Sequence, residues 1–243
     1  DGRKEASGVH LRTADQGSQV VEARKEIILS AGSIGSPQIL QLSGIGPGKF
    51  LSSKGIEVMH DLPGVGENLH DHLQVRTVYK VQNTITLNQR ANSFIGKAMM
   101  GLEYLLFRTG PLTMPPSQLG AFAKSDSNQP TANIEWHVQP LSLDKFGDPL
   151  HKFNAITPAV CNLRPTSRGH VRIKTSRPEE YPAITLNYLS TEEDRKIAVD
   201  GLKFTRRIMA AKALDKFKPL EWKPGPEVTS EEELYKAASD LGT

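Results

Sequence analysis

The sequence predicts a mixed fold, α/β in its first part and α+β in the remainder. Three observations lead to this prediction. An apolar strand runs directly into a glycine turn and a short helix between residues 26 and 47. Several segments between residues 73 and 175 alternate apolar and polar side chains, as strands of an antiparallel sheet do. A long amphipathic helix follows over residues 190–214, and it would cover one side of that sheet.

The composition restricts the kind of protein. The 243 residues carry 30 Lys and Arg against 27 Asp and Glu, interspersed, for a net charge of +3, so we do not expect a nucleic-acid partner. The single cysteine, Cys161, excludes an internal disulfide framework and a cysteine-rich metal centre. No run approaches the roughly 18 apolar residues of a membrane span, and the first residues lack a signal-peptide core. The localisation stays open between the cytoplasm and the periphery of a membrane.

The first 72 residues divide into a hairpin, two short helices and a loop. Residues 8–13 alternate, an Asp/Gly turn follows, and a long second arm ends in the apolar run 27–29, which we expect to be covered on both faces. Ser36 before Pro37 predicts a helix N-terminus, and Gly44 predicts its C-terminal cap. A second short helix over 48–56 and a loop over 61–72 complete this part.

The remainder alternates between strand and helix patterns. Residues 94–107 carry a helical apolar stripe, residues 190–214 begin with a Ser/Thr cap and early acidic residues, and a last short helix follows the proline-rich link after residue 218. The methionines Met99, Met100, Met114 and Met209 are expected to be packing residues. The strand candidates are 73–81, 119–125, 132–140, 154–163 and 169–175.

Gly32 is a candidate ligand contact. It follows the apolar strand directly, and without a Cβ its backbone can approach a bound molecule closely. The free N–H groups of the helix that follows suit a phosphate or a dinucleotide. The same pattern also fits a tight strand-to-helix crossover in which glycine serves packing alone, and one glycine turn does not decide between the two.

Two groups of polar side chains could carry chemistry. His70 and His72 flank Asp71 in the loop, but no third ligand is evident, so we assign no metal site. Glu135 and His137 alternate with Trp136 and so share one face of a strand, which Gln139 also joins. That face is either solvated or lines a ligand cavity. Cys161 lies inside an apolar strand and is expected to be a buried small side chain, not a nucleophile.

The glycine-rich stretch extends into a much longer pattern. Its defined positions resemble the second signature of the glucose-methanol-choline (GMC) oxidoreductase family at each point: Gly32-Ser33-x-x-Ser36-Pro37-x-Ile39-Leu40-x-x-Ser43-Gly44-Ile45-Gly46. The later segments "LPGVGENLHDH", "RPTSRGHVRI", "YPAITLNYLS" and "EEDRKIAVDGLK" resemble further landmarks of that family in the same order. The resemblance spans almost the whole chain.

The resemblance implies a domain organisation and a cofactor. It implies FAD, bound covalently or noncovalently, in a Rossmann-like FAD-binding domain, with a substrate domain built on an antiparallel sheet. Residues 1–72 would then belong to the FAD-binding region, 73–225 to the substrate-binding domain and 226–243 to the start of a C-terminal return segment. The cofactor-binding residues implied are Ala31, Gly32, Ser33 and Asn68, with Asn68, Asp71 and His72 fixing their loop by side-chain to backbone bonds. The substrate-binding residues implied are Glu135, His137 and Gln139.

The activity implied is oxidation of a primary or secondary alcohol, a small molecule, by hydride transfer to FAD, with the electron acceptor unknown. The G-x-G-x-x-G fingerprint of the family is absent, and its catalytic histidine belongs to a segment expected just beyond Thr243. We therefore expect an internal piece of an FAD-dependent alcohol dehydrogenase or oxidase, inactive alone, and assign no catalytic residue. The alternative is a noncatalytic binding or scaffold module derived from the same fold.

Overall fold

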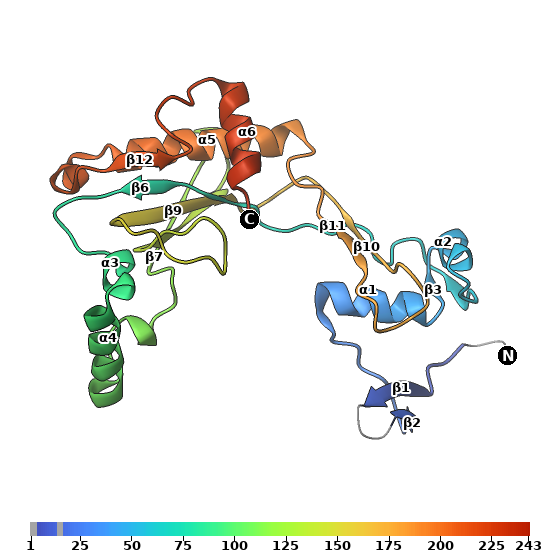
Figure 1. The fold of residues 1–243 in the computed structure, drawn as a ribbon. Coiled ribbons are helices and arrows are strands. Elements are labelled where there is room, and N and C mark those ends of the chain that lie inside the picture. Colours follow the sequence, from blue (N-terminus) through green and yellow to red (C-terminus); the bar gives the residue numbers. More distant parts are fainter. Residues whose placement is uncertain (1–3, 14–16) are drawn as a thin grey trace. The chain divides into compact units, whose positions relative to one another are not determined.

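The computed structural model describes residues 4–13 and 17–243, which form two compact units (Figure 1). The first unit comprises the chain up to residue 69 together with residues 170–185. The second, called the sheet unit below, comprises residues 70–169 and 186–243. The predicted domain bounds at residues 72 and 225 stay a prediction.

The first unit begins with a two-stranded hairpin. β1 (Gly8–Thr13) and β2 (Gly17–Glu22) pair antiparallel, from Gly8 opposite Glu22 to Thr13 opposite Gly17, which confirms the predicted hairpin; residues 14–16 of its turn lie outside the described residues. The predicted length of the second arm is wrong. No described strand pairs with residues 23–31, and Ile28 and Leu29 in the apolar run are 78% and 38% exposed, so the run is not covered on both faces as predicted.

The predicted helix is present in the first unit, but it begins earlier than the sequence indicates. α1 (Gly32–Leu42) starts at Gly32, and Ser36 lies inside it, where its hydroxyl accepts a hydrogen bond from the Ala31 backbone N–H at 3.1 Å. The first four N–H groups of a helix have no acceptor within the helix, so a helical turn can form before Pro37. Pro37 itself lacks an N–H group and therefore removes only one backbone hydrogen bond of the helix. Gly44 follows the helix with φ +80°, and a Cβ there would lie 2.4 Å from the Glu57 carbonyl oxygen, which confirms the predicted glycine cap.

A buried glutamine holds the return segment 170–185 in the first unit. Gln41 on α1 is fully buried; its amide donates to the Val171 carbonyl at 2.9 Å, and its oxygen accepts from the Ile173 N–H at 2.9 Å. This bidentate contact satisfies the polar groups of the amide in an apolar setting. The other elements are β3 (Ile45–Gly46), parallel to β4 (His60–Asp61), α2 (Gly48–Ser53), and β10 (His170–Arg172), antiparallel to β11 (Ala183–Thr185).

The sheet unit contains the predicted antiparallel sheet, but without the candidate strand 169–175, which lies in the first unit as β10 and pairs with β11 there. Its strand order is β12-β6-β9-β8-β7, with β5 also paired to β9. The ladder beside β9 breaks at Thr77, because Pro158 opposite has no N–H; the Thr77 hydroxyl donates to the Pro158 carbonyl at 2.7 Å instead. The strands are β5 (Gln74–Arg76), β6 (Val78–Lys80), β7 (Leu119–Ala123), β8 (Ile134–Gln139), β9 (Ala155–Asn162) and β12 (Leu220–Lys223).

Two helices cover the apolar face of this sheet. α5 (Glu192–Met209) packs on β9, and α6 (Glu231–Leu241) packs on α5 and β5 (Figure 1). Their buried apolar side chains form one core with Trp136 and Val160. A Cβ at Gly201 of α5 would lie 3.1 Å from the Val160 side chain, so glycine lets this helix approach the sheet closely. Thr191 caps α5, as the sequence predicts, and a capping box opens α6. The 3₁₀ segment η2 (Lys212–Phe217) follows α5.

The predicted helix over 94–107 is confirmed, but its apolar stripe is exposed. α4 (Phe94–Phe107) follows α3 (Leu87–Asn92) and leads away from the sheet, with the 3₁₀ turn η1 (Pro111–Thr113) after it (Figure 1). Met100 is its one buried residue. The packing prediction is therefore confirmed for Met100 and Met209 and wrong for Met99 and Met114, which are more than half exposed because no described element covers them.

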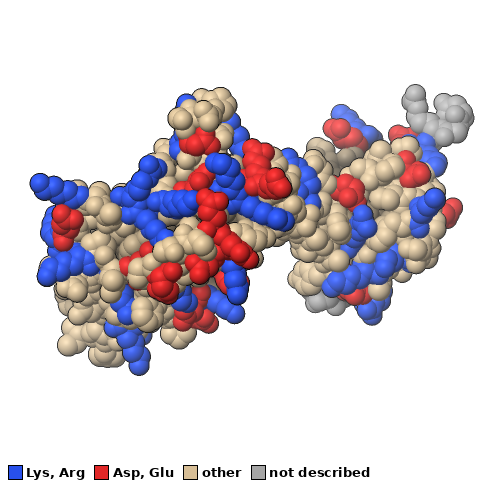
Figure 2. Space-filling model, turned by 90° about the horizontal axis from the view of Figure 1, so that it is seen from above, with Lys and Arg blue, Asp and Glu red and all other residues tan. Residues whose placement is uncertain are grey.

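Charged side chains of both signs lie intermixed on the face of the molecule shown in Figure 2. Among the helices of the described residues, none is long and apolar enough to cross a membrane.

Candidate functional site

One face of the strand β8, which lies between β9 and β7 in the sheet, carries a cluster of polar side chains. Strand alternation turns Trp136 into the core, where its indole N–H donates to the Thr205 hydroxyl at 2.8 Å, and turns Glu135 and His137 to the opposite side. The prediction that one face is core and the other polar is confirmed. Whether the polar face lines a substrate cavity stays a prediction.

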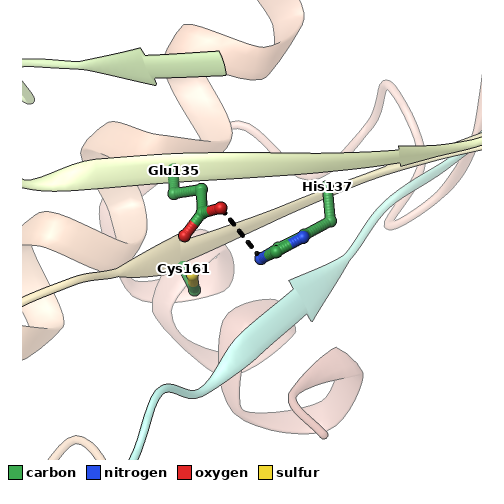
Figure 3. A group of neighbouring side chains, drawn as sticks. All are labelled: Glu135, His137 and Cys161. Atoms are coloured by element: carbon green, nitrogen blue, oxygen red, sulfur yellow. Dashed lines mark ion pairs between the residues drawn. The ribbon is translucent and has the colours of Figure 1, made fainter. Parts of the chain in front are cut away.

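Glu135 and His137 form a pair on this face. The Glu135 Oε1 and His137 Nε2 atoms lie 3.3 Å apart, and the two side chains point toward one another in Figure 3. The side chain of His137 is 32% exposed and that of Glu135 is 17% exposed, so both can be reached by a bound molecule. The pair therefore presents a carboxylate and an imidazole side by side.

Cys161 completes the group from the neighbouring strand. It is the cross-strand partner of Glu135 in the β8–β9 ladder, and the two side chains lie next to one another in Figure 3. Cys161 is 3% exposed. Burial and the negative charge of Glu135 raise the pKa of its thiol to about 11. The thiol is therefore protonated at neutral pH. The prediction of a buried side chain is confirmed, whereas the prediction that Cys161 is not a nucleophile stays a prediction.

Gln139 is held by two partners. Its oxygen accepts a hydrogen bond from Arg76 Nη2 at 2.8 Å, and its amide donates to the Ser117 hydroxyl at 3.1 Å. Because Gln139 is 5% exposed, most of its surface is unavailable to a ligand in this conformation.

Arg76 is a residue that the sequence analysis missed. It is 7% exposed, its guanidinium carbon lies 4.5 Å from the Phe146 ring centroid, and burial lowers its pKa. Its Nη1 is buried without a hydrogen-bond partner among the described residues. The signal was a lone arginine within an alternating apolar strand. Arg76 lines a hollow of 660 Å³, with Phe146, Lys223 and Thr243 also on its wall, within the size range of small-molecule sites.

The predicted cofactor residues lie in the first unit. The N-terminus of α1 is formed by three consecutive exposed residues, Ala31, Gly32 and Ser33. Gly32 has φ +75°, and a Cβ built on it would meet no atom within 4 Å, so the space beside it is open. Asn68 lies in the loop of the same unit, also with a left-handed φ of +63°.

The predicted loop bonds are present around His72. The Asp71 carboxylate accepts from the His72 N–H at 2.9 Å and from the Tyr188 hydroxyl at 2.8 Å. The His72 Nε2 lies 3.0 Å from the Leu163 carbonyl oxygen. These bonds confirm that Asp71 and His72 fix the loop, whereas the same role for Asn68 stays a prediction.

Comparison with known families gives two matches. Residues 1–74 match one family model described as GMC oxidoreductase, and residues 165–242 match a second model with the same description. The two matched regions include α1 with Gly32 in the first case and the helices α5 and α6 in the second.

Curated relatives cover most of the chain. An oxygen-dependent choline dehydrogenase from Pectobacterium carotovorum subsp. carotovorum is 39% identical over 216 residues, 89% of this chain and 38% of the relative. One from Photobacterium profundum is 38% identical over 231 residues, 95% of this chain and 40% of the relative. The chain thus spans well under half the length of these relatives.

Solved structures show the same fold. A formate oxidase from Aspergillus oryzae matches with a TM-score of 0.89 at 23% identity, over 98% of this chain and 46% of that one. An FAD-dependent oxidoreductase from Chaetomium thermophilum matches with a TM-score of 0.83 at 24% identity, over 99% of this chain and 48% of that one. The predicted mixed fold with an antiparallel sheet is therefore confirmed.

Proposed function

This chain belongs to the GMC oxidoreductase family, and we propose that its protein oxidises a small alcohol by hydride transfer to FAD. FAD is the cofactor of this family. When bound, the flavin supplies the acceptor for the hydride that leaves the carbinol carbon. The chain's own residues would position the cofactor and the substrate.

The exposed start of α1 supports a role for Ala31, Gly32 and Ser33 in holding FAD. The backbone at Gly32 is open to a ligand because no Cβ and no neighbouring atom fills the space beside it. Helix N–H groups without helical acceptors and the positive end of the helix dipole favour a phosphate there. Asn68, in the loop of the same unit, is the fourth residue that we assign to the cofactor.

The polar face of β8 supports a role in substrate binding, and the Glu135–His137 pair is the observation that carries this part of the proposal. A half-buried carboxylate attracts a cationic substrate, and the adjacent imidazole can hydrogen-bond a substrate hydroxyl. Gln139, fixed by Arg76 and Ser117, would orient the substrate or support the site. No residue of this chain is assigned to take the substrate's proton.

Choline is the first substrate to test, because the curated relatives are named choline dehydrogenases and choline is a cationic alcohol. In the full-length protein, Glu135→Gln should raise the KM for choline by up to about fivefold, the equivalent of about 1 kcal/mol for one partly exposed charge contact. The KM for 3,3-dimethylbutan-1-ol, a neutral alcohol of the same shape, should stay unchanged, as should the flavin content.

The matched control is Glu232→Gln, which removes an exposed carboxylate from α6. It should leave both KM values as they are. Equal KM values in the wild type and Glu135→Gln would show that this face does not bind the substrate. A protein that binds FAD but oxidises no alcohol would favour the noncatalytic alternative.

A further inference from the structure

We propose that Glu135, His137 and Cys161 form a binding site for a thiophilic divalent cation of the Zn²⁺ type. The ligand atoms of these three side chains all lie within 4.8 Å of one another, and they are drawn together in Figure 3. A carboxylate, an imidazole and a thiol are three of the side-chain groups that bind zinc in proteins. The proposal stands on this geometry and does not depend on the proposed oxidoreductase activity.

The sheet fixes the three side chains in place. Glu135 and His137 stand two residues apart on β8 and therefore project from the same face. Cys161 lies directly opposite Glu135 in the antiparallel ladder with β9. Both strands are anchored from behind, because Trp136 and Val160, between and beside the ligands, are buried in the core. The backbone geometry of the site is thus set without the ion.

The distances suit a tetrahedral ion. Zinc bonds of about 2.0–2.2 Å to nitrogen and oxygen place those two ligand atoms about 3.3–3.5 Å apart in a tetrahedron. The Glu135 Oε1 to His137 Nε2 separation is 3.3 Å. With a bond of about 2.3 Å to sulfur, the sulfur should lie about 3.6 Å from the other two atoms. The three ligand atoms lie at most 4.8 Å apart, so the sulfur must approach the other two by at most little more than 1 Å. A small adjustment of the side-chain torsion angles achieves this movement.

The chemistry selects the kind of cation. Thiolate and imidazole ligands favour Zn²⁺ and Co²⁺, whereas Mg²⁺ and Ca²⁺ prefer sets of oxygen ligands. On binding, the metal–sulfur bond forms as the S–H bond breaks, and the proton passes to solvent. The negative charges of the Glu135 carboxylate and the Cys161 thiolate balance the charge of the ion, so a bound ion would compete with a cationic substrate for Glu135. Three protein ligands leave a fourth position open to water.

A Co²⁺ titration of the protein tests the site directly, since Co²⁺ takes the same ligands and reports them by absorption. We expect one Co²⁺ per chain, a thiolate-to-Co²⁺ charge-transfer band in the near ultraviolet, and loss of that band when Zn²⁺ is added. Cys161→Ala should remove the band completely. His137→Gln should weaken Co²⁺ binding at least tenfold, because even changes outside the ligand set cost about 10–100-fold in metal affinity.

The control variant is His60→Gln, which removes an exposed histidine from the first unit and should leave the titration unchanged. Circular dichroism establishes that each variant is folded. A folded wild type that gives no charge-transfer band overturns the proposal, and so does Co²⁺ affinity that is unchanged in His137→Gln. The readout needs neither flavin nor turnover, so its failure would leave the proposed function untouched.

Discussion

Replacing Asp194 with asparagine should destabilise the sheet unit strongly. Asp194 lies in the first turn of α5 and is 3% exposed. One carboxylate oxygen accepts from the Thr166 N–H at 2.9 Å and from the Asn162 amide at 3.1 Å, and the other accepts from the Ser167 N–H at 2.8 Å. The side chain therefore joins the helix to the loop that follows β9.

The expected loss in the free energy of unfolding is about 2.5–6 kcal/mol, the sum of two contributions. A hydrogen bond to a charged group contributes about 1.5–3 kcal/mol, and a buried donor left without an acceptor costs about 1–3 kcal/mol. Asparagine keeps one oxygen but turns an NH₂ group toward one of the N–H donors, so Asp194→Asn loses at least one such bond and leaves one donor unsatisfied.

The loss should also depend on pH. Burial raises the pKa of Asp194, but the hydrogen bonds from Ser167 and Thr166 outweigh it and hold the pKa below its usual value. A carboxylate with a depressed pKa in the folded state stabilises the protein fully above the pKa of the unfolded chain, about 3.9. This contribution disappears as the pH falls through the lower folded pKa.

Urea unfolding followed by circular dichroism measures the effect, at neutral pH and again in acid. The control is Glu193→Gln, in the same helical turn but exposed, which should cost less than about 1 kcal/mol. Two results would refute the reasoning. The first is a free energy of unfolding for Asp194→Asn within about 1 kcal/mol of the wild-type value, which is below the loss expected for a buried hydrogen bond to a charged group. The second is a difference between the two proteins that does not shrink in acid.

Three further predictions concern the cofactor and the thiol. The 243-residue chain purified alone should be colourless, because it lacks the glycine fingerprint that binds the FAD pyrophosphate; a stoichiometric flavin spectrum would contradict this. In the full-length protein, Gly32→Val should lower the flavin content. Gly32→Asn should fold normally because asparagine tolerates the φ of +75°, so a low flavin content in this variant would come from the lost cofactor contact and not from backbone strain. Wild-type flavin content in the folded valine variant would remove Gly32 from the FAD site. Cys161, with its pKa raised to about 11, should react with a thiol reagent near neutral pH far more slowly in the folded protein than after unfolding in urea, and equal rates would show that the thiol is accessible.

The sequence predicts best those features that depend on neighbours along the chain. The alternation at Glu135, Trp136 and His137 is local, so β8 and its two faces could be assigned directly. The cap at Thr191 and the glycine after α1 likewise act within one turn. The GMC signature over residues 32–46 is likewise a pattern of neighbouring residues, and the resemblance implied the fold and the cofactor.

Features that depend on distant partners could not be predicted. The apolar stripe of α4 and the run at Ile28 are present in the sequence, but a pattern does not show which surface covers it, and the stripe and Ile28 are largely exposed in the described chain. The bond between Arg76 and Gln139 and the contact of Cys161 with Glu135 both depend on the order and register of the sheet. Gln41 gave no signal at all, since a glutamine on a helix is usually exposed.

Anaerobic mixing of the oxidised full-length protein with choline tests the proposed oxidoreductase activity most directly. If the protein transfers a hydride from an alcohol to FAD, the visible absorbance of the oxidised flavin should bleach, with one aldehyde formed per flavin reduced. A flavin that stays oxidised with choline and with a series of neutral primary and secondary alcohols, while a chemical reductant bleaches it, would contradict the proposal.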